Sequence, residues 1–276
     1  MSAVRARLDD ATRQLAAAGI DSPRVDAELL LAHALGIERS RLSTVDGPVP
    51  ASFGELVERR ANREPLQYIV GRTAFRYLDL AVGPGVFVPR PETELLVDAV
   101  LPKLGPGPIV VDLCAGSGAL ALAVADEVPG ATVYAVERSA AALSWLRRNA
   151  SGTKVIVVEG DVADPTLLAA LHGRVDTVLS NPPYVPTTTA VAPEVRADPD
   201  EAVFAGADGL AVIPAVIARA AQLLRPGGRL ALEHDDTHGE AVPSLLRTAG
   251  EWHEVADHRD LAGRPRYVTA VRAAAP

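Results

Sequence analysis

The sequence predicts an α/β protein in which a mostly parallel sheet, covered by helices, follows a small helical domain. From residue 109 onward, short apolar runs without polar alternation take turns with helical segments, and such runs are typical of strands buried on both faces. Before residue 62, apolar residues recur at helical spacing instead. The 276 residues are enough for two domains.

The first part of the chain is expected to form helices joined by short turns. Ser22 and Pro23 predict a helix start, because serine can cap free backbone amides and proline is tolerated in a first turn. Gly36 is expected to end that helix. A proline-rich turn then precedes another helix at about 51–63. We therefore assign residues 1–67 to an N-terminal helical domain.

Residues 68–90 differ in pattern, because their apolar residues alternate or cluster around glycines as in a hairpin. The apolar cluster Tyr68, Ile69 and Val70 is included in this hairpin. We interpret the segment as a β-hairpin bridge between two domains. A helix is expected from Pro91 to about Leu101, so residues 91–276 would form the second domain.

The second domain is predicted to alternate strands and helices, ending in a closing pair of strands after the turn at Pro226. The expected strands are Ile109–Leu113, Thr132–Val136, Lys154–Val158, Thr177–Ser180, Arg229–Glu233, Trp252–Ala256 and Tyr267–Val271, and the expected helices are Ala119–Ala125, Ala140–Ala150 and Ala211–Leu224.

Composition excludes several function classes. The net charge of -8 and pI of about 5.3 disfavour bulk DNA binding. A dense basic stretch is left open as either a solvated helix face or a local basic patch. No signal-peptide pattern and no apolar run of the ~20 residues that cross a bilayer is evident, so we expect a cytoplasmic, soluble enzyme. We also expect it to be a monomer. The dense basic stretch named above contains Arg59, Arg60, Arg63, Arg72 and Arg76.

A glycine-rich turn between the first strand and first helix of the second domain predicts a nucleotide-like cofactor. Such a turn lets a ligand approach backbone amides at a helix N-terminus. Glu137 lies 19 residues after Gly118, at the end of the next strand, where a carboxylate can hold both ribose hydroxyls. This pattern alone does not separate a nicotinamide cofactor from S-adenosylmethionine, or either from a structural turn. The loop residues are Cys114, Ala115, Gly116, Ser117 and Gly118.

Cys114 stands where such a loop usually has its first glycine. Cysteine is small enough for the turn if its backbone dihedrals are negative. A reactive thiol is the alternative, since a helix start lowers the pKa of a thiol.

The tetrapeptide Asn181-Pro182-Pro183-Tyr184 follows the fourth strand of this domain, so it lies at the same edge of the sheet as the glycine-rich turn. An amide or aromatic amine is a poor nucleophile because its lone pair is delocalised, so a site that methylates it must orient the nitrogen. The Asn181 side-chain oxygen and the Pro182 carbonyl can each accept one hydrogen of an NH2 group. Tyr184 offers an aromatic face for a planar acceptor. A proline turn without function is the alternative.

These motifs resemble the HemK/PrmC family, which methylates the glutamine of the Gly-Gly-Gln motif in class I peptide chain release factors. The resemblance covers nearly the whole chain. It includes Pro65–Gly71, Phe87–Glu94, Arg225–Gly228 and Leu232–His234 as well as the two motifs above.

The resemblance implies a class I methyltransferase with a Rossmann-like sheet, S-adenosyl-L-methionine as methyl donor and S-adenosyl-L-homocysteine as product. It implies that the loop 114–118 contacts the methionine part and ribose, that Glu137 holds the ribose and that Val162 flanks adenine. Asn181 would contact the cofactor and, with Pro182, Pro183 and Tyr184, hold the glutamine. Asn181, Pro182 and Tyr184 are the predicted catalytic residues, and no metal is expected. The helical domain would help to hold the release factor. The release factor is the substrate of this transferase and acts in translation termination.

Two stretches invite other interpretations. His234–Glu240 contains two histidines and three carboxylates and could bind a metal; it also fits Asp236 or Thr237 capping the helix that follows. Pro89–Glu92 could be a helix start, or Arg90 or Glu92 could line the site entrance.

Three other functions compete with glutamine methylation. The acceptor motif could hold the amino group of a flipped adenine, although acidity and the absence of a recognisable reading module argue against it. A dinucleotide-dependent oxidoreductase would need a second nucleotide-binding half. A non-catalytic binding module would need a decayed cofactor loop, but Gly116, Gly118, Glu137 and Asn181 are all present.

Overall fold

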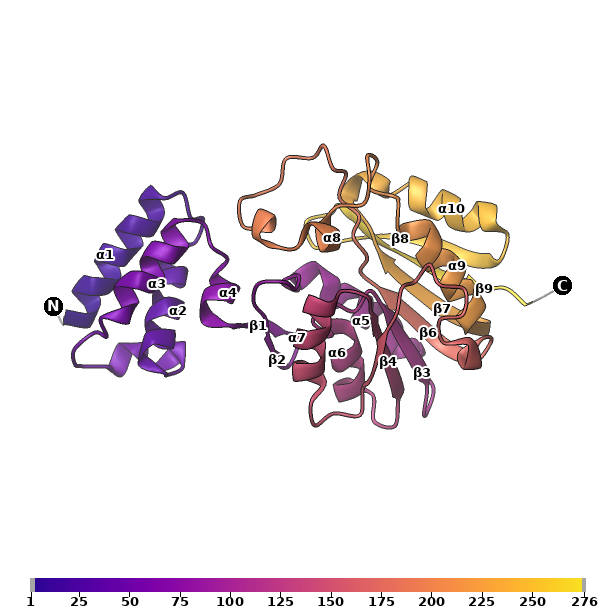
Figure 1. Cartoon of the computed structure of the whole chain (residues 1–276), viewed down its shortest axis with the longest axis horizontal. Coiled ribbons are helices and arrows are strands. Elements are labelled where there is room, and N and C mark those ends of the chain that lie inside the picture. The colour runs from indigo at the N-terminus through magenta and orange to yellow at the C-terminus, as the bar shows by residue number, and fades with distance from the viewer. Residues whose placement is uncertain (1–2, 275–276) are drawn as a thin grey trace. The chain divides into compact units, whose positions relative to one another are not determined.

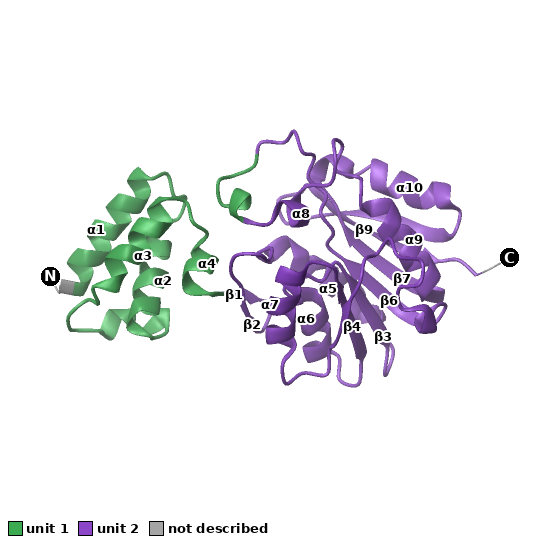
Figure 2. Cartoon of the chain, viewed as in Figure 1, with its two compact units in different colours: residues 1–72, 191–197 green, residues 73–190, 198–276 purple. Residues whose placement is uncertain are grey.

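The computed structural model describes residues 3–274, which form two compact units (Figure 2). The first unit consists of residues 1–72 together with 191–197, and the second of residues 73–190 and 198–276. The short stretch 191–197 therefore packs with the helical unit although it lies far along the chain.

Helices form the first unit, as the sequence predicts. Its elements are α1 (Ala3–Ala17), α2 (Pro23–Leu35), the 3-10 helix η1 (Arg39–Thr44), α3 (Ser52–Ala61), α4 (Leu66–Val70) and η5 (Val195–Ala197). Leu15, Leu30 and Phe53 are among the fully buried side chains of its core.

The predicted boundaries of α2 are confirmed, but the predicted cap is wrong. Ser22 is the N-cap residue, yet its side chain makes no capping hydrogen bond. Gly36 ends the helix in the left-handed conformation, with φ of 65°, and its amide donates to carbonyls of the last turn. Glycine adopts this conformation without the steric cost of a side chain.

The basic stretch is not simply a solvated helix face, because Arg60 is buried in an ion-pair cluster of the first unit. Arg60 Nε donates to Asp26 Oδ2 at 2.7 Å, and its NH1 donates to Glu194 Oε1 at 2.9 Å. Arg63 reaches the other oxygen of Glu194 at 2.8 Å. Glu194 belongs to the stretch 191–197, so these pairs hold that stretch in the helical unit. Both arginines are engaged by carboxylates, which argues against a phosphate-binding patch.

The predicted hairpin begins later than expected. Tyr68, Ile69 and Val70 lie in the helix α4, because Pro65 precedes the first turn and Gly71 ends it with φ of 76°. The hairpin itself consists of β1 (Arg72–Phe75) and β2 (Leu78–Ala81). Arg76 lies between these strands and pairs with Asp98 and Glu127.

The second unit contains a seven-stranded sheet in the order β5-β4-β3-β6-β7-β9-β8 (Figure 1). The strands from β5 to β7 run parallel, and β9 pairs antiparallel with both β7 and β8. A final pair of strands was predicted, but its antiparallel direction was not. The strands are β3 (Ile109–Leu113), β4 (Thr132–Glu137), β5 (Ile156–Glu159), β6 (Val175–Ser180), β7 (Leu224–Glu233), β8 (Trp252–Arg259) and β9 (Pro265–Arg272).

Helices cover both faces of this sheet (Figure 1), and alternate strand residues pack into two separate cores. Val110 and Leu179 belong to one core, whereas Val111 and Val178 belong to the other. The helical elements are η2 (Pro91–Thr93), α5 (Glu94–Val100), η3 (Leu101–Lys103), α6 (Ala119–Glu127), α7 (Ala140–Ala150), η4 (Ala169–Leu171), α8 (Asp200–Val203), α9 (Ile213–Leu223), η6 (Asp236–His238) and α10 (Ala241–Ala249).

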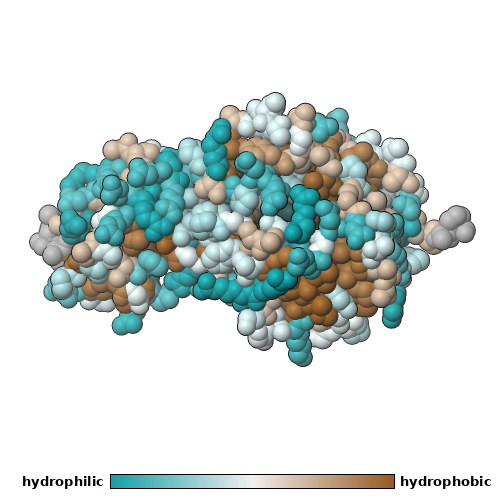
Figure 3. All heavy atoms as spheres, in the orientation of Figure 1, coloured by the Kyte–Doolittle hydropathy of each residue, from teal (hydrophilic) through white to brown (hydrophobic). Residues whose placement is uncertain are grey.

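Within residues 3–274, none of the helices has the length and apolar character needed to span a membrane. Hydrophilic side chains occupy much of the face of each unit seen in Figure 3.

We expect Asp26→Ala to lower the free energy of unfolding by about 2 kcal/mol or more, because it leaves the buried Arg60 guanidinium short of a partner. Urea unfolding measures this. Asp9→Ala is the matched control, since Asp9 pairs with Arg24 on the surface and should contribute at most about 1 kcal/mol. Equal losses in the two variants would contradict a structural role for the buried cluster.

Candidate functional site

The predicted cofactor loop and acceptor motif follow neighbouring parallel strands. Leu113 at the end of β3 pairs with Ser180 at the end of β6, and the Ser180 hydroxyl donates to the Leu113 carbonyl at 2.7 Å. The loop 114–118 and the motif 181–184 therefore leave the sheet side by side. This is the edge at which open α/β sheets bind ligands.

The loop between β3 and α6 is a tight turn that only small residues allow. Gly116 and Gly118 adopt φ of 55° and 87°. A Cβ on Gly116 would meet no atom within 4 Å, so the space over this residue is open to a ligand. A Cβ on Gly118 would instead lie 2.5 Å from Leu146 Cδ1, because the start of α6 packs closely on α7. The two glycines thus serve ligand access and packing respectively.

Cys114 departs from what the sequence suggested. We expected negative dihedrals, but its φ is 64°, in the left-handed region that favours glycine. The turn therefore keeps a glycine-like backbone with a side chain that lacks β-branching. Burial, together with the charges of Glu137 and Asp112, raises the pKa of the Cys114 thiol, which argues against the reactive-thiol alternative.

Glu137 fastens the cofactor loop to the end of β4. Its Oε2 accepts a hydrogen bond from the Gly116 amide at 2.8 Å, and its Oε1 accepts from the amides of Arg138 and Ser139, each at 2.8 Å. The sequence predicted a carboxylate at this place but not these bonds. A carboxylate has about four acceptor positions, so the predicted bond to a ribose hydroxyl is compatible with them.

A buried carboxyl group lies near the end of β3, just before the loop. Asp112 is 1% exposed, and its Oδ2 accepts from the Ala121 amide at 3.1 Å. Its Oδ1 is buried and receives no hydrogen bond from the described residues. Burial raises the pKa of this carboxyl. The open space over Gly116 and the carboxylate of Glu137 at the end of the next strand fit a nucleoside, which S-adenosylmethionine contains.

Val162, predicted to flank adenine, lies in the loop after β5 and is buried against the core beneath the sheet edge. Its carbonyl accepts from Arg219 Nε at 3.3 Å. Its contact with adenine stays a prediction.

The acceptor motif is fixed at both ends. β6 ends at Ser180, and Val185 then forms a parallel bridge with Phe204, with its amide donating to the Val203 carbonyl at 2.9 Å. Between these points, the Pro182 carbonyl accepts no backbone hydrogen bond from the described part of the chain. This oxygen is therefore free of backbone partners among the described residues. Its predicted role, to accept a hydrogen from the NH2 group of the methyl acceptor, stays a prediction.

The Asn181 side chain is oriented by Thr93 of η2. Its Nδ2 donates to the Thr93 hydroxyl oxygen at 3.1 Å. Because the amide is planar, this bond directs Oδ1 the opposite way. An Asn181 oxygen that faces away from Thr93 has the polarity needed to accept a hydrogen from an NH2 group.

Tyr184 is held by its hydroxyl as well as its ring. The hydroxyl donates to Glu233 Oε1 at 2.8 Å, and burial together with the Glu233 charge raises the pKa of Tyr184. Gly209 packs against the motif, since a Cβ there would lie 2.3 Å from the Tyr184 carbonyl oxygen. The sequence indicated a ring-stacking role for Tyr184 but not this hydrogen bond.

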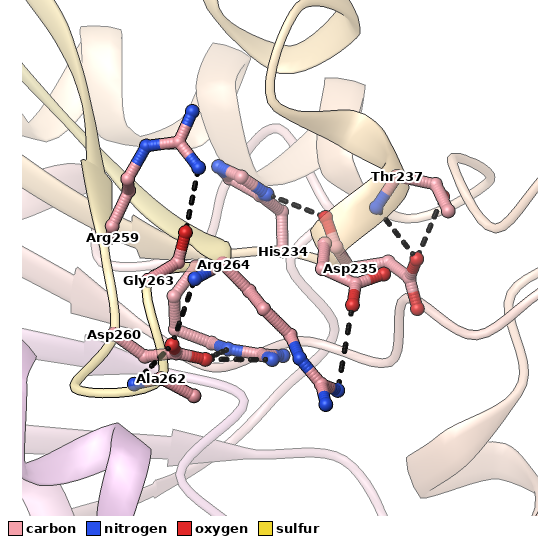
Figure 4. A network of polar contacts seen from close by, with 10 residues as sticks. His234, Asp235, Thr237, Arg259, Asp260, Ala262, Gly263 and Arg264 are labelled. Atoms are coloured by element: carbon pink, nitrogen blue, oxygen red, sulfur yellow. Dashed lines mark hydrogen bonds and ion pairs between the residues drawn. The ribbon is translucent and has the colours of Figure 1, made fainter.

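Glu233 ends β7 and is 1% exposed. Burial raises its pKa to about 7, whereas the hydroxyls of Thr93 and Tyr184 and the charge of Arg266 oppose the rise. Arg266 is in turn held by Asp260, whose Oδ2 accepts from its NH2 at 3.1 Å. Figure 4 shows Asp260 in the turn between β8 and β9, where its Oδ1 also accepts from the amides of Ala262 and Arg264.

The stretch His234–Glu240 is a structural cap. No group of residues suited to a metal ion occurs in residues 3–274. His234 Nδ1 lies 2.8 Å from the Asp235 carbonyl, and its Nε2 lies 2.9 Å from Asp257 Oδ1 (Figure 4 shows the first contact). The predicted cap residue was wrong by one position or more: Asp235 accepts from the Thr237 amide and caps η6, and α10 begins separately.

Arg90 is a structural residue rather than a free group at an entrance. Its NH2 pairs with Asp198 Oδ2 at 2.5 Å, and its guanidinium lies 5.0 Å from the centre of the Phe87 ring. Asp198 Oδ1 also accepts from the Val88 amide. The short helix η2 begins at Pro91, so the helix-start interpretation of this stretch is confirmed.

Comparisons with known proteins agree with this geometry. Residues 7–71 match the family model described as PrmC N-terminal domain, and residues 77–197 match the methyltransferase small domain. A release factor glutamine methyltransferase of Mycolicibacterium smegmatis is 51% identical over 99% of both chains. The chain belongs to the release factor glutamine methyltransferase family. A Streptomyces coelicolor member of this family is 50% identical, again over 99% of both chains.

Two further similarities bear on substrate and fold. A 4-amino-L-phenylalanine/4-methylamino-L-phenylalanine methyltransferase of Streptomyces pristinaespiralis is 44% identical over 89% of this chain and 87% of its own. Among solved structures, a Pyrococcus furiosus methyltransferase superposes with a TM-score of 0.53 at 18% identity, covering 73% of this chain and 92% of that one. The second similarity shows the class I methyltransferase fold.

Glu233 gives this family member a pH dependence of stability opposite to that of most carboxylates. Its pKa is about 7 when folded against an ordinary value of 4.5. Between these values the folded protein keeps a proton that the unfolded chain releases. The free energy of unfolding should therefore fall as the pH rises through this window, by roughly 3 kcal/mol.

Glu233→Gln removes this titration while keeping the shape of the side chain. Urea unfolding at about pH 5 and about pH 8 should show the Gln variant gaining on the wild type by several kcal/mol at the higher pH. A difference that stays constant with pH would rule out the raised pKa.

Proposed function

We propose that this methyltransferase transfers a methyl group from S-adenosyl-L-methionine to the side-chain amide nitrogen (N5) of the glutamine in the Gly-Gly-Gln motif of class I peptide chain release factors, and so modulates translation termination. Membership of the release factor glutamine methyltransferase family supports the reaction and its methyl donor. The observation that carries the proposal is the orientation of Asn181, whose Nδ2 is engaged by Thr93.

In the proposed site, each hydrogen of the acceptor amide has its own acceptor. Asn181 Oδ1 takes one hydrogen and the Pro182 carbonyl takes the other, which fixes the plane of the glutamine amide. The two prolines restrict the backbone, so these acceptors are in place before the substrate binds. Tyr184, anchored by Glu233, packs against the flat amide.

The bound cofactor supplies a methyl carbon on a positively charged sulfur that keeps the bonding electrons as a neutral thioether. The residues of the chain hold the nitrogen in line and require no metal. The new bond joins nitrogen to carbon, and one amide hydrogen leaves as a proton to water. No strong base is proposed, because the product remains a neutral amide.

The residues proposed to hold the cofactor are the loop 114–118, Glu137, Val162 and Asn181. Support comes from the open space over Gly116 and from the Glu137 carboxylate at the end of the next strand. A Thermus thermophilus rRNA methyltransferase solved with AdoMet and guanosine superposes with a TM-score of 0.50 at 25% identity, covering 73% of this chain and 49% of that one.

The proposed partner is a release factor, with residues 1–67 contributing to its binding. The match of residues 7–71 to the PrmC N-terminal domain supports this role. The monomeric state and cytoplasmic location expected from the sequence remain predictions.

Labelled methyl transfer from S-adenosylmethionine tests the proposal. The substrates are a purified class I release factor, the same factor with the glutamine of Gly-Gly-Gln replaced, duplex DNA, and 4-amino-L-phenylalanine. Label on the intact factor alone is expected. Label on DNA would favour the adenine alternative, and label on the free amino acid would favour a small aromatic amine as substrate.

Asn181→Ala and Glu137→Ala should separate the two halves of the site. Asn181→Ala is expected to keep cofactor binding but to lower turnover by about a hundredfold or more, because an oriented acceptor is lost. Glu137→Ala should weaken cofactor binding, since the loop loses its anchor at Gly116. Calorimetric titration of the cofactor and steady-state kinetics measure these effects. Unchanged turnover in the first variant would remove the proposed mechanism.

A further inference from the structure

A buried carboxylate lies directly beside the acceptor motif and is used by neither the cofactor loop nor the motif's backbone. Leu232 of β7 pairs with Ser180 of β6, so Glu233 and Asn181, the next residue of each strand, come together at the sheet edge. Thr93 of η2 accepts a hydrogen bond from Asn181 and lies near enough to Glu233 to lower the pKa of its carboxyl. A chain of polar groups therefore runs from Asn181 through Thr93 to Glu233.

The direction of the hydrogen bonds among Asn181, Thr93 and Glu233 depends on which of these groups can donate a hydrogen. Glu233 Oε1 receives the hydrogen of the Tyr184 hydroxyl at 2.8 Å. Its Oε2 is buried and receives no hydrogen bond of standard geometry from the described residues. A buried carboxylate oxygen without a donor is costly. Thr93, which is 3% exposed, carries the second hydroxyl, besides that of Tyr184, that lowers the pKa of this carboxyl.

A threonine hydroxyl has one hydrogen and two lone pairs. If that hydrogen is directed at Glu233, the Thr93 oxygen has only lone pairs to offer Asn181. It can then bind the NH2 end of the Asn181 amide but not its oxygen, as the bond at 3.1 Å shows. With the Thr93 hydrogen directed at a charged Glu233, the NH2 end of the Asn181 amide would face Thr93 and its oxygen would face the substrate.

We propose that Thr93 and Glu233 are positioning residues for methyl transfer, which fix the Asn181 amide with its oxygen toward the acceptor nitrogen. This inference rests on the proposed function. Neither residue touches the reacting atoms in this scheme. Tyr184 shares the Glu233 carboxylate, so one buried group orders both polar side chains of the motif.

The charged and titratable groups around Glu233 set the pH range in which the polar groups of Asn181, Thr93 and Glu233 are ordered. Glu92 of η2 raises its pKa, whereas Arg266 of β9 and the Tyr184 hydroxyl lower it, and burial brings it to about 7. Below this pH the carboxyl carries its own hydrogen and no longer requires the one from Thr93. Turnover should then fall as the pH falls through about 7.

Four variants test the proposal on the full chain. Thr93→Val removes the hydroxyl at constant shape and should lower kcat about tenfold or more, with the KM for S-adenosylmethionine nearly unchanged. Thr93→Ser should restore most of the loss. Glu233→Gln should lower kcat and remove the pH dependence near neutrality. Thr177→Val is the matched control, because Thr177 is also buried but lies toward the other end of β6.

Wild-type kcat in Thr93→Val, or a Thr93→Ser variant as impaired as Thr93→Val, would overturn the inference. A loss that Thr177→Val shares equally would mark it as a folding effect and also overturn it. The side-chain amide protons of Asn181, observed by NMR, give a readout that needs no turnover: slow exchange in the wild type and fast exchange in Thr93→Val are expected, and equal exchange would overturn the inference. Absence of methyl transfer by the wild type would instead count against the proposed function.

Discussion

The parallel pairing of β3, β6 and β7 is the constraint on which the site depends. Because these strands run in the same direction, their carboxyl ends lie at one edge of the sheet, and three different segments begin or end there. The cofactor turn follows β3, the acceptor motif follows β6 and Glu233 ends β7. None of these segments is close to the others in sequence, so only this register assembles them.

The chemistry of an amide acceptor explains why the motif is so firmly held. Its nitrogen lone pair is delocalised, and a site gains little from a base but much from orientation. The structure provides orientation in layers: the bridge between Val185 and Phe204 fixes the backbone, Thr93 holds the Asn181 amide, and Glu233 anchors Tyr184. Asp260 and Arg266, in turn, place a positive charge near Glu233.

Sequence pattern predicted the parts of the fold that local physics decides. The apolar strands, such as Ile109–Leu113, and the left-handed stop at Gly36 are confirmed because burial and backbone sterics act on adjacent residues. The assignment of Tyr68–Val70 to a hairpin failed because apolar residues in so short a run do not distinguish a strand from one helical turn. Long-range pairing was also beyond the pattern, so Arg60 was not recognised as a buried partner of Asp26 and Glu194.

For the site, the sequence indicated the loop and the motif but not what supports them. In the sequence, Thr93 is part of a helix start and Glu233 is the end of a strand, and only the fold brings them close to Asn181.

The most direct measurement is a crystal structure of the protein with S-adenosylhomocysteine and a peptide containing Gly-Gly-Gln. We predict the glutamine side-chain nitrogen within hydrogen-bond distance of both the Asn181 side-chain oxygen and the Pro182 carbonyl. A glutamine nitrogen bound by other groups, and remote from the Asn181 side-chain oxygen and the Pro182 carbonyl, would contradict the account.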